Sequence, residues 1–182
     1  MKKTVFVFLL FFLTGCTTVY NVKVPVISSV IYELTYKIDL PREEYFNSDG
    51  VKILFIDSHV TQAGCGFNWE GVIPIIYLNV DYLKQFPKEF QWFVFYHEIG
   101  HHKMGHTNLI IDESMSEEDY EEFRTGLEYE TTMFSLWFLY KEHNYGDKEF
   151  DVIFYYMRQE LDSDLVDFME EFRKEKLKTS VN

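Results

Sequence analysis

The sequence is poor in cysteine and in positive charge. Its 182 residues include two cysteines, Cys16 and Cys65, and show no internal repeat or low-complexity tract. Only 17 Lys and Arg stand against 30 Asp and Glu, which gives a formal net charge of −13. Nucleic acid and anionic lipid surfaces are therefore poor partners, because both repel a strongly acidic protein. The aromatic content of 19% predicts a core rich in Phe and Tyr.

The N-terminal end combines a short basic region with an apolar run that is too short to span a bilayer comfortably. Residues 1–3 carry two lysines, residues 4–13 carry no charge, and Leu13-Thr14-Gly15-Cys16 follows. This end resembles the lipobox of bacterial lipoprotein signal peptides, in which a small residue precedes the cysteine that receives lipid. The alternative is an ordinary signal peptide or a membrane anchor.

The lipobox resemblance predicts how the chain is divided and where it works. It implies a signal peptide over residues 1–15, lipidation of Cys16, a membrane tether over residues 16–29 and a single domain over residues 30–182. Acyl chains on Cys16 would hold this domain at a membrane on the extracytoplasmic side of the bacterial cell envelope. Cys65 then has no partner for an internal disulfide. We expect it to be a small buried side chain, with metal ligation and nucleophilic chemistry as the alternative roles.

The first half of the chain favours strands. Residues 51–56 and 72–79 are rich in β-branched and aromatic side chains, and a glycine-rich loop over residues 63–66 separates them. Residues 30–38 fit either a strand or a short helix. Pro74 favours an edge or a bulge position for the second strand, because proline has no N–H to donate.

The second half favours helices. Residues 81–86 fit a short helix, and residues 88–104 fit a longer one that begins after Pro87 and ends at Gly105.

Two further helical segments follow towards the C-terminus. Ser116 and Asp119 form a capping box that opens a helix over residues 117–142. The second half of that helix is apolar nearly all round, so we expect it to be the central buried helix. Residues 147–178 form a final amphipathic segment that is broken near residues 162–164. Strands followed by helices predict an α+β fold, with a small antiparallel or mixed sheet packed on helix 88–104 and two further C-terminal helices.

The motif that carries chemistry is His97-Glu98-Ile99-Gly100-His101, which reads H-E-x-x-H on the predicted helix 88–104. Two histidines four residues apart lie one helical turn apart on the same face, so both imidazoles can reach one Zn²⁺. Glu98 is then placed to accept a proton from a metal-bound water. This spacing predicts a zinc hydrolase with Glu98 as its general base.

A catalytic zinc site needs a third protein ligand, which must come from elsewhere in the chain. His102 follows His101 at about 100° round the helix and points away from the pair. His106 misses the slot that the metzincin pattern requires. Glu128 and Glu130 on the next helix are the better candidates, and at most one of them faces the metal because they lie about 200° apart.

Around these residues the chain resembles a group of known peptidases. The histidine motif with Gly105-His106 is similar to H-E-h-G-H-x-x-x-G-H in gluzincin peptidases of the HtpX/Ste24 type, and loosely to ImmA/IrrE metallopeptidases. The resemblance implies that Glu128 is the third zinc ligand, with Glu130 as the alternative. Thr131 stands where Ala is usual, and Thr132 where Asp or Asn supports the site. The resemblance also implies that strand 72–79 is an edge strand, whose residues 75–79 pair with an extended substrate.

Together these features predict a zinc-dependent peptidase that is anchored to the envelope by lipid and acts on a polypeptide substrate. His143, Tyr155 and Tyr156 are candidate donors to the oxyanion. The alternative is a non-catalytic or degenerate zinc-binding lipoprotein that acts by binding an envelope partner, which the departure at Thr132 leaves open. A weaker third interpretation is zinc sequestration by the clustered histidines.

Overall fold

The computed structural model describes residue 40, residues 43–58, 63–67, 71–109 and 114–160, and residues 167, 170, 173 and 174. The predicted signal peptide with Cys16, the tether, the segment 30–38 and the predicted break at 162–164 lie outside the described residues.

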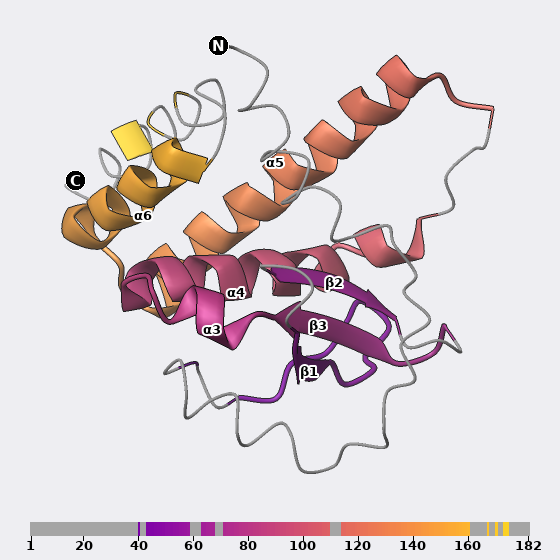
Figure 1. Cartoon of the computed structure of the whole chain (residues 1–182), viewed down its shortest axis with the longest axis horizontal. Helices are drawn as coiled ribbons and strands as arrows, with labels where there is room; N and C mark the ends of the chain where they lie inside the picture. The colour runs from indigo at the N-terminus through magenta and orange to yellow at the C-terminus, as the bar shows by residue number, and fades with distance from the viewer. Residues whose placement is uncertain are drawn as a thin grey trace.

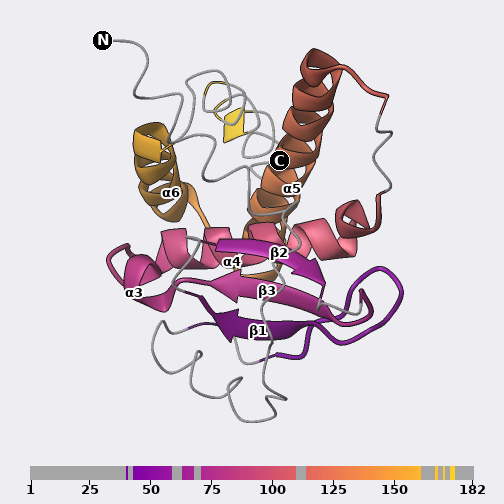
Figure 2. The same cartoon turned by 45° about the vertical axis from the view of Figure 1, so that its right-hand side comes forward.

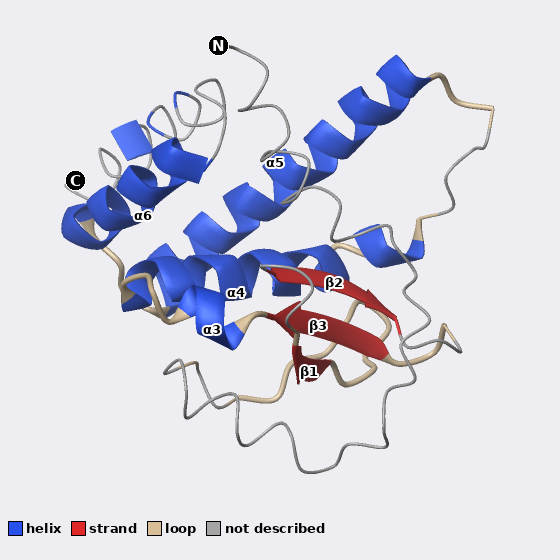
Figure 3. Ribbon diagram, in the orientation of Figure 1, coloured by secondary structure: helices blue, strands red, loops and turns tan. Residues whose placement is uncertain are grey.

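The strands form a small mixed sheet that precedes the helices in the chain (Figure 3). Its strands are β1 (Leu54–Asp57), β2 (Ala63–Phe67) and β3 (Pro74–Leu78), in the order β1-β3-β2. β3 pairs in parallel with β1 and antiparallel with β2. Of the two predicted possibilities, an antiparallel or a mixed sheet, the mixed sheet is therefore confirmed.

Two expectations about the strands were wrong. The predicted glycine-rich loop at 63–66 is strand β2, because pairing with β3 overrides the low strand propensity of its glycines. β3 is the central strand and not an edge, so residues 75–78 are paired on both sides and cannot pair with a substrate. Pro74 is tolerated because it is the first residue of the strand, where a missing N–H costs little.

The helices are α3 (Val80–Leu83), α4 (Lys88–Lys103), the 3₁₀ turn η2 (His106–Asn108), α5 (Glu117–Glu142) and α6 (Asp147–Glu160). Helices α4 and α5 begin and end close to the predicted positions, α3 is shorter than the predicted helix 81–86, and the predicted segment 147–178 is helical over residues 147–160. Ser116 Oγ accepts the backbone N–H of Asp119 and caps α5, as the capping box predicted. Gly105 follows α4 with φ 77°, a left-handed conformation that suits glycine and turns the chain away. Among the described residues, no helix combines the length and the apolar character that crossing a bilayer requires.

Helix α4 lies between two layers, which confirms the α+β architecture. Figures 1 and 2 show the sheet on one side of α4 and the helices α5 and α6 on the other. Phe90, Val94 and Ile99 are among the many buried side chains of α4. The second half of α5 was expected to be the central buried helix, but Trp137 within it is 45% exposed. α4 takes that central place because it packs against the sheet, α5 and α6.

Hydrogen bonds fix the C-terminal end of α4 to the sheet layer. The buried ring of His102 contacts the carbonyl oxygen of Ile75 in β3 through Nε2, at 3.0 Å, and Thr107 Oγ1 lies 3.1 Å from its Nδ1. The backbone N–H of Ser48 donates to the carbonyl of His102. These contacts hold the last turn of α4, which carries His101 and His102, at a fixed place over the strands.

Helices α4 and α5 approach each other closely at Gly100. A Cβ atom at this position would lie 2.9 Å from Cδ1 of Phe134 and 3.4 Å from Cγ2 of Thr131. Glycine at position 100 therefore lets α5 pack directly on the turn that lies between the two histidines of the motif.

Gly100→Ala is expected to lower the free energy of unfolding by about 1–3 kcal/mol, because the added methyl group overpacks the interface with Phe134. Gly126→Ala on α5 is the matched control, since a Cβ there meets nothing within 4 Å. Helix propensity alone should make that control more stable, by up to about 1 kcal/mol. Urea denaturation of the metal-free variants measures both changes. A Gly100→Ala protein as stable as the control would contradict the close approach.

Candidate metal centre

Three side chains from two helices converge at one point, and we call them the histidine–glutamate trio: His97 and His101 of α4 and Glu128 of α5. His97 Nε2 lies 2.9 Å from Glu128 Oε2 and 3.2 Å from His101 Nε2. The remaining distance, from His101 Nε2 to Glu128 Oε2, is 3.6 Å. Three atoms that carry lone pairs approach this closely only around a shared proton or a cation.

The size of the trio fits a tetrahedral metal ion. Zinc bonds of about 2.0–2.1 Å at a tetrahedral angle place two ligand atoms about 3.3 Å apart. The distances of 2.9, 3.2 and 3.6 Å within the trio bracket that value. The trio is also one of the groups of His, Cys, Asp and Glu in the described residues that could hold a metal ion. The donor set therefore suits a zinc-class cation with three protein ligands.

Glu128 is held in its charged form. Burial raises the pKa of this carboxyl, but hydrogen bonds to His101 and His97 and the electrostatic interaction with both side chains outweigh that effect. The net result is a pKa well below the usual range of a glutamate. An anionic oxygen is thus available beside the two imidazoles at neutral pH.

A second layer of contacts orients the ring of His101. Glu130 Oε2 lies 3.1 Å from His106 Nε2, and His106 Nδ1 lies 3.2 Å from His101 Nδ1. A carboxylate can only accept, so His106 donates through Nε2, and its Nδ1 then accepts the N–H of His101. This chain of hydrogen bonds directs the lone pair of His101 Nε2 towards the trio. Glu130, the alternative ligand, therefore lies behind His106 rather than in the trio.

The threonines at positions 131 and 132 contact the same imidazoles. Thr132 Oγ1 lies 3.4 Å from His97 Nδ1, where a hydroxyl can accept the ring N–H. This is a longer contact than a carboxylate usually makes, but it falls at the supporting position. Thr131 donates its hydroxyl to the carbonyl of Leu127, while its oxygen lies 3.3 Å from His101 Nε2. The departure at Thr132 thus keeps a polar partner for His97.

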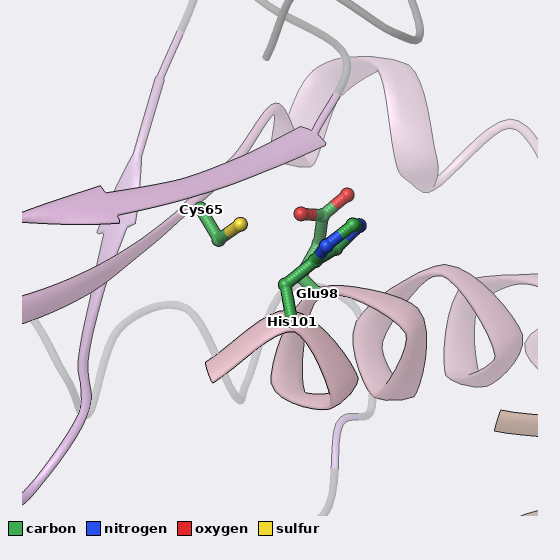
Figure 4. A group of neighbouring side chains, drawn as sticks. All are labelled: Cys65, Glu98 and His101. Atoms are coloured by element: carbon green, nitrogen blue, oxygen red, sulfur yellow. The ribbon is translucent and has the colours of Figure 1, made fainter. Parts of the chain in front are cut away.

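Glu98 occupies the side of α4 that faces the sheet. It is 6% exposed and belongs to a second group of potential ligand atoms, with Cys65 of β2 and His101. Figure 4 shows the Cys65 side chain directed from its strand towards the Glu98 carboxylate and the ring of His101. The sequence indicated that Cys65 would be a buried side chain, which it is, but its place beside Glu98 depends on a strand that was expected to be a loop.

The predicted oxyanion donors make their contacts elsewhere. His143 Nε2 bonds to the hydroxyl of Tyr96 at 2.6 Å, and its ring packs on Trp92. Tyr156 packs on Phe86 and Phe90 near the start of α4, and Tyr155 packs on Tyr156. No contact of these three side chains with the trio is found among the described residues.

A histidine pair on one helix, a carboxylate from the next helix and a glutamate beside the pair define a zinc-metallopeptidase-like class of protein. The model of the IrrE N-terminal-like domain family, Peptidase_M78, matches residues 45–173, and the chain belongs to this family. The match favours the ImmA/IrrE resemblance noted in the sequence over the HtpX/Ste24 one. No curated protein and no solved structure gives a significant match.

Alanine substitutions of Glu128, His106 and Glu130 are expected to weaken zinc binding by decreasing amounts, in that order. Glu128→Ala removes a ligand and should cost the most. His106→Ala leaves His101 without its orienting partner and should cost about 10–100-fold. Glu130→Ala should cost less than about tenfold, because this side chain is 60% exposed. Competition with a fluorescent zinc chelator measures all three.

His106→Asn is the rescue control for this series. An asparagine oxygen can accept the His101 N–H near the position of His106 Nδ1, so part of the affinity should return. If His106→Ala weakened zinc binding only by disturbing the packing at residue 106, His106→Asn would not restore the affinity. Tighter zinc binding by Glu128→Ala than by Glu130→Ala would reassign the third ligand.

Proposed function

We propose that this chain is a zinc-dependent peptidase, in which His97, His101 and Glu128 hold the ion and Glu98 is the general base. The observation that carries the proposal is the convergence of two Nε2 atoms and one carboxylate oxygen next to the buried Glu98. Membership of the Peptidase_M78 family supports it. The substrate class that this family implies is polypeptide.

The roles of the protein groups follow from where they lie. A bound zinc ion supplies a Lewis acid that polarises a peptide carbonyl and acidifies water. Glu98 takes a proton from the attacking water and returns it to the leaving amine. Its burial beside His101 keeps this proton transfer away from bulk solvent.

Strand β2 is the element that we assign to substrate binding. Within the described residues it pairs with β3. It also packs on α4 and contributes Cys65 next to Glu98. A polypeptide that reaches Glu98 would therefore lie close to this strand.

The non-catalytic alternative is less well supported. A structural zinc site is closed by four protein ligands, whereas the histidine–glutamate trio supplies three. A structural ion also needs no general base, yet Glu98 is retained and buried at the site. The Thr132 hydroxyl near His97 further weakens the case for a degenerate centre.

We also propose that the domain is tethered to the cell envelope by lipid on Cys16. The support comes from the N-terminal sequence, where an uncharged apolar run precedes Leu13-Thr14-Gly15-Cys16. Acyl chains there would act as an anchor, and they would place the peptidase on the extracytoplasmic side.

Glu98→Gln is expected to retain zinc and to lose peptidase activity by about 10²–10⁴-fold, because the amide cannot accept the proton of water. The assay is the cleavage of casein by the zinc-loaded protein, followed by mass spectrometry. Glu89→Gln, the same change in the first turn of α4, is the control and should leave turnover intact. Unchanged cleavage by Glu98→Gln would rule out the proposed general base.

Cys16→Ala is expected to abolish incorporation of labelled palmitate and to release the protein from the membrane fraction of a bacterial host. Cys65→Ala removes the other cysteine and should still be labelled. Labelling of Cys16→Ala, or recovery of the wild-type chain in the soluble fraction, would refute the anchor.

A further inference from the structure

A second group of potential ligand atoms lies next to the histidine–glutamate trio, and we call it the cysteine group: Cys65, Glu98 and His101. The Sγ, carboxylate oxygen and imidazole nitrogen of these residues all lie within 4.8 Å of one another. All three residues are buried, with Cys65 and His101 each 2% exposed. Figure 4 shows the thiol and the carboxylate directed towards each other across the gap between β2 and α4.

The cysteine group and the trio have only His101 in common. Cys65 belongs to β2 and Glu98 lies near it on α4, whereas His97 and Glu128 meet at the contact of α4 with α5. His101 Nδ1 is hydrogen bonded to His106, and a neutral imidazole offers a single nitrogen lone pair to an ion. One nitrogen lone pair binds one ion at a time, and an ion in one group therefore excludes an ion from the other.

The two groups differ in the type of cation that they favour. Two imidazoles and a carboxylate suit zinc, while a thiolate in place of an imidazole raises the preference for softer cations over harder ones. We propose that Cys65, Glu98 and His101 form a second ion position for a thiophilic divalent cation such as Cd²⁺. As the sulfur–metal bond forms, the thiol proton of Cys65 passes to solvent. The ligand atoms of this group lie within 4.8 Å of one another, so small side-chain rotations would bring them to one ion.

Occupation of this position would block the peptidase in two ways. Glu98 becomes a ligand and can no longer accept a proton from water, and His101 is removed from the trio. A thiophilic ion would thus inactivate the protein without acting as a simple replacement for zinc. This consequence rests on the proposed function, whereas the ion position itself does not.

Titration of the metal-free full-length chain with Cd²⁺ tests the position directly. Binding through Cys65 should produce the ultraviolet absorption of a thiolate–cadmium bond. Cys65→Ser and Cys65→Ala should both lose this absorption and weaken Cd²⁺ binding by about tenfold or more. The alanine variant keeps the test valid if a serine hydroxyl at this buried position prevents folding. Zn²⁺ affinity of the alanine variant should stay within about twofold of wild type, since zinc is held by the trio.

Variants of the trio decide whether the two ion positions are separate. His97→Ala should keep the thiolate–cadmium absorption, while His101→Ala should lose it. Loss of the absorption in His97→Ala would mean that Cys65 is a fourth ligand of the trio ion, and it would overturn the proposal. Absence of the absorption in the wild-type chain would overturn it as well. Neither result depends on peptidase activity, so a failure here is distinct from a failure of the proposed function.

Discussion

The site depends on how closely α4 and α5 approach each other. Gly100 allows Phe134 and Thr131 to pack on the turn between His97 and His101, and the preceding turn of α5 then places Glu128 beside both rings. A ligand set tolerates errors of only about 0.5 Å. Because packed interiors transmit small displacements, a larger side chain at residue 100 would move the carboxylate out of reach. A helix–helix contact that makes no bond to the ion therefore determines whether the ion can be held.

His101 is the residue on which the separate parts of the site converge. It belongs to both the histidine–glutamate trio and the cysteine group. Its ring is oriented by the hydrogen bond to His106, which in turn is hydrogen bonded to Glu130. Its neighbour His102 meanwhile joins the same turn of α4 to β3. The sheet, α5 and the η2 turn thus all contact the last turn of α4, which carries His101 and His102. This concentration explains how a small mixed sheet can position both the proposed general base and a proposed metal ligand.

Local sequence signals predicted the helices well, because capping and glycine termination act within a few residues. Ser116 with Asp119 opens α5, and Gly105 follows α4, as the sequence indicated. Strand order and β2 could not be predicted in this way, since both depend on pairing between distant segments. At the site, helical spacing identified His97, Glu98 and His101 as neighbours, and the family resemblance selected Glu128. The contacts of Thr132, His106 and Cys65 needed the tertiary structure, because each joins two elements that the sequence does not place together.

The most direct test of the central claim is zinc-edge X-ray absorption on the full chain loaded with one equivalent of Zn²⁺. The account predicts one tightly bound ion whose nearest shell contains two imidazole nitrogens and oxygen, with no sulfur, since zinc belongs to His97, His101 and Glu128. A shell made only of water oxygens, or one dominated by sulfur, would contradict it.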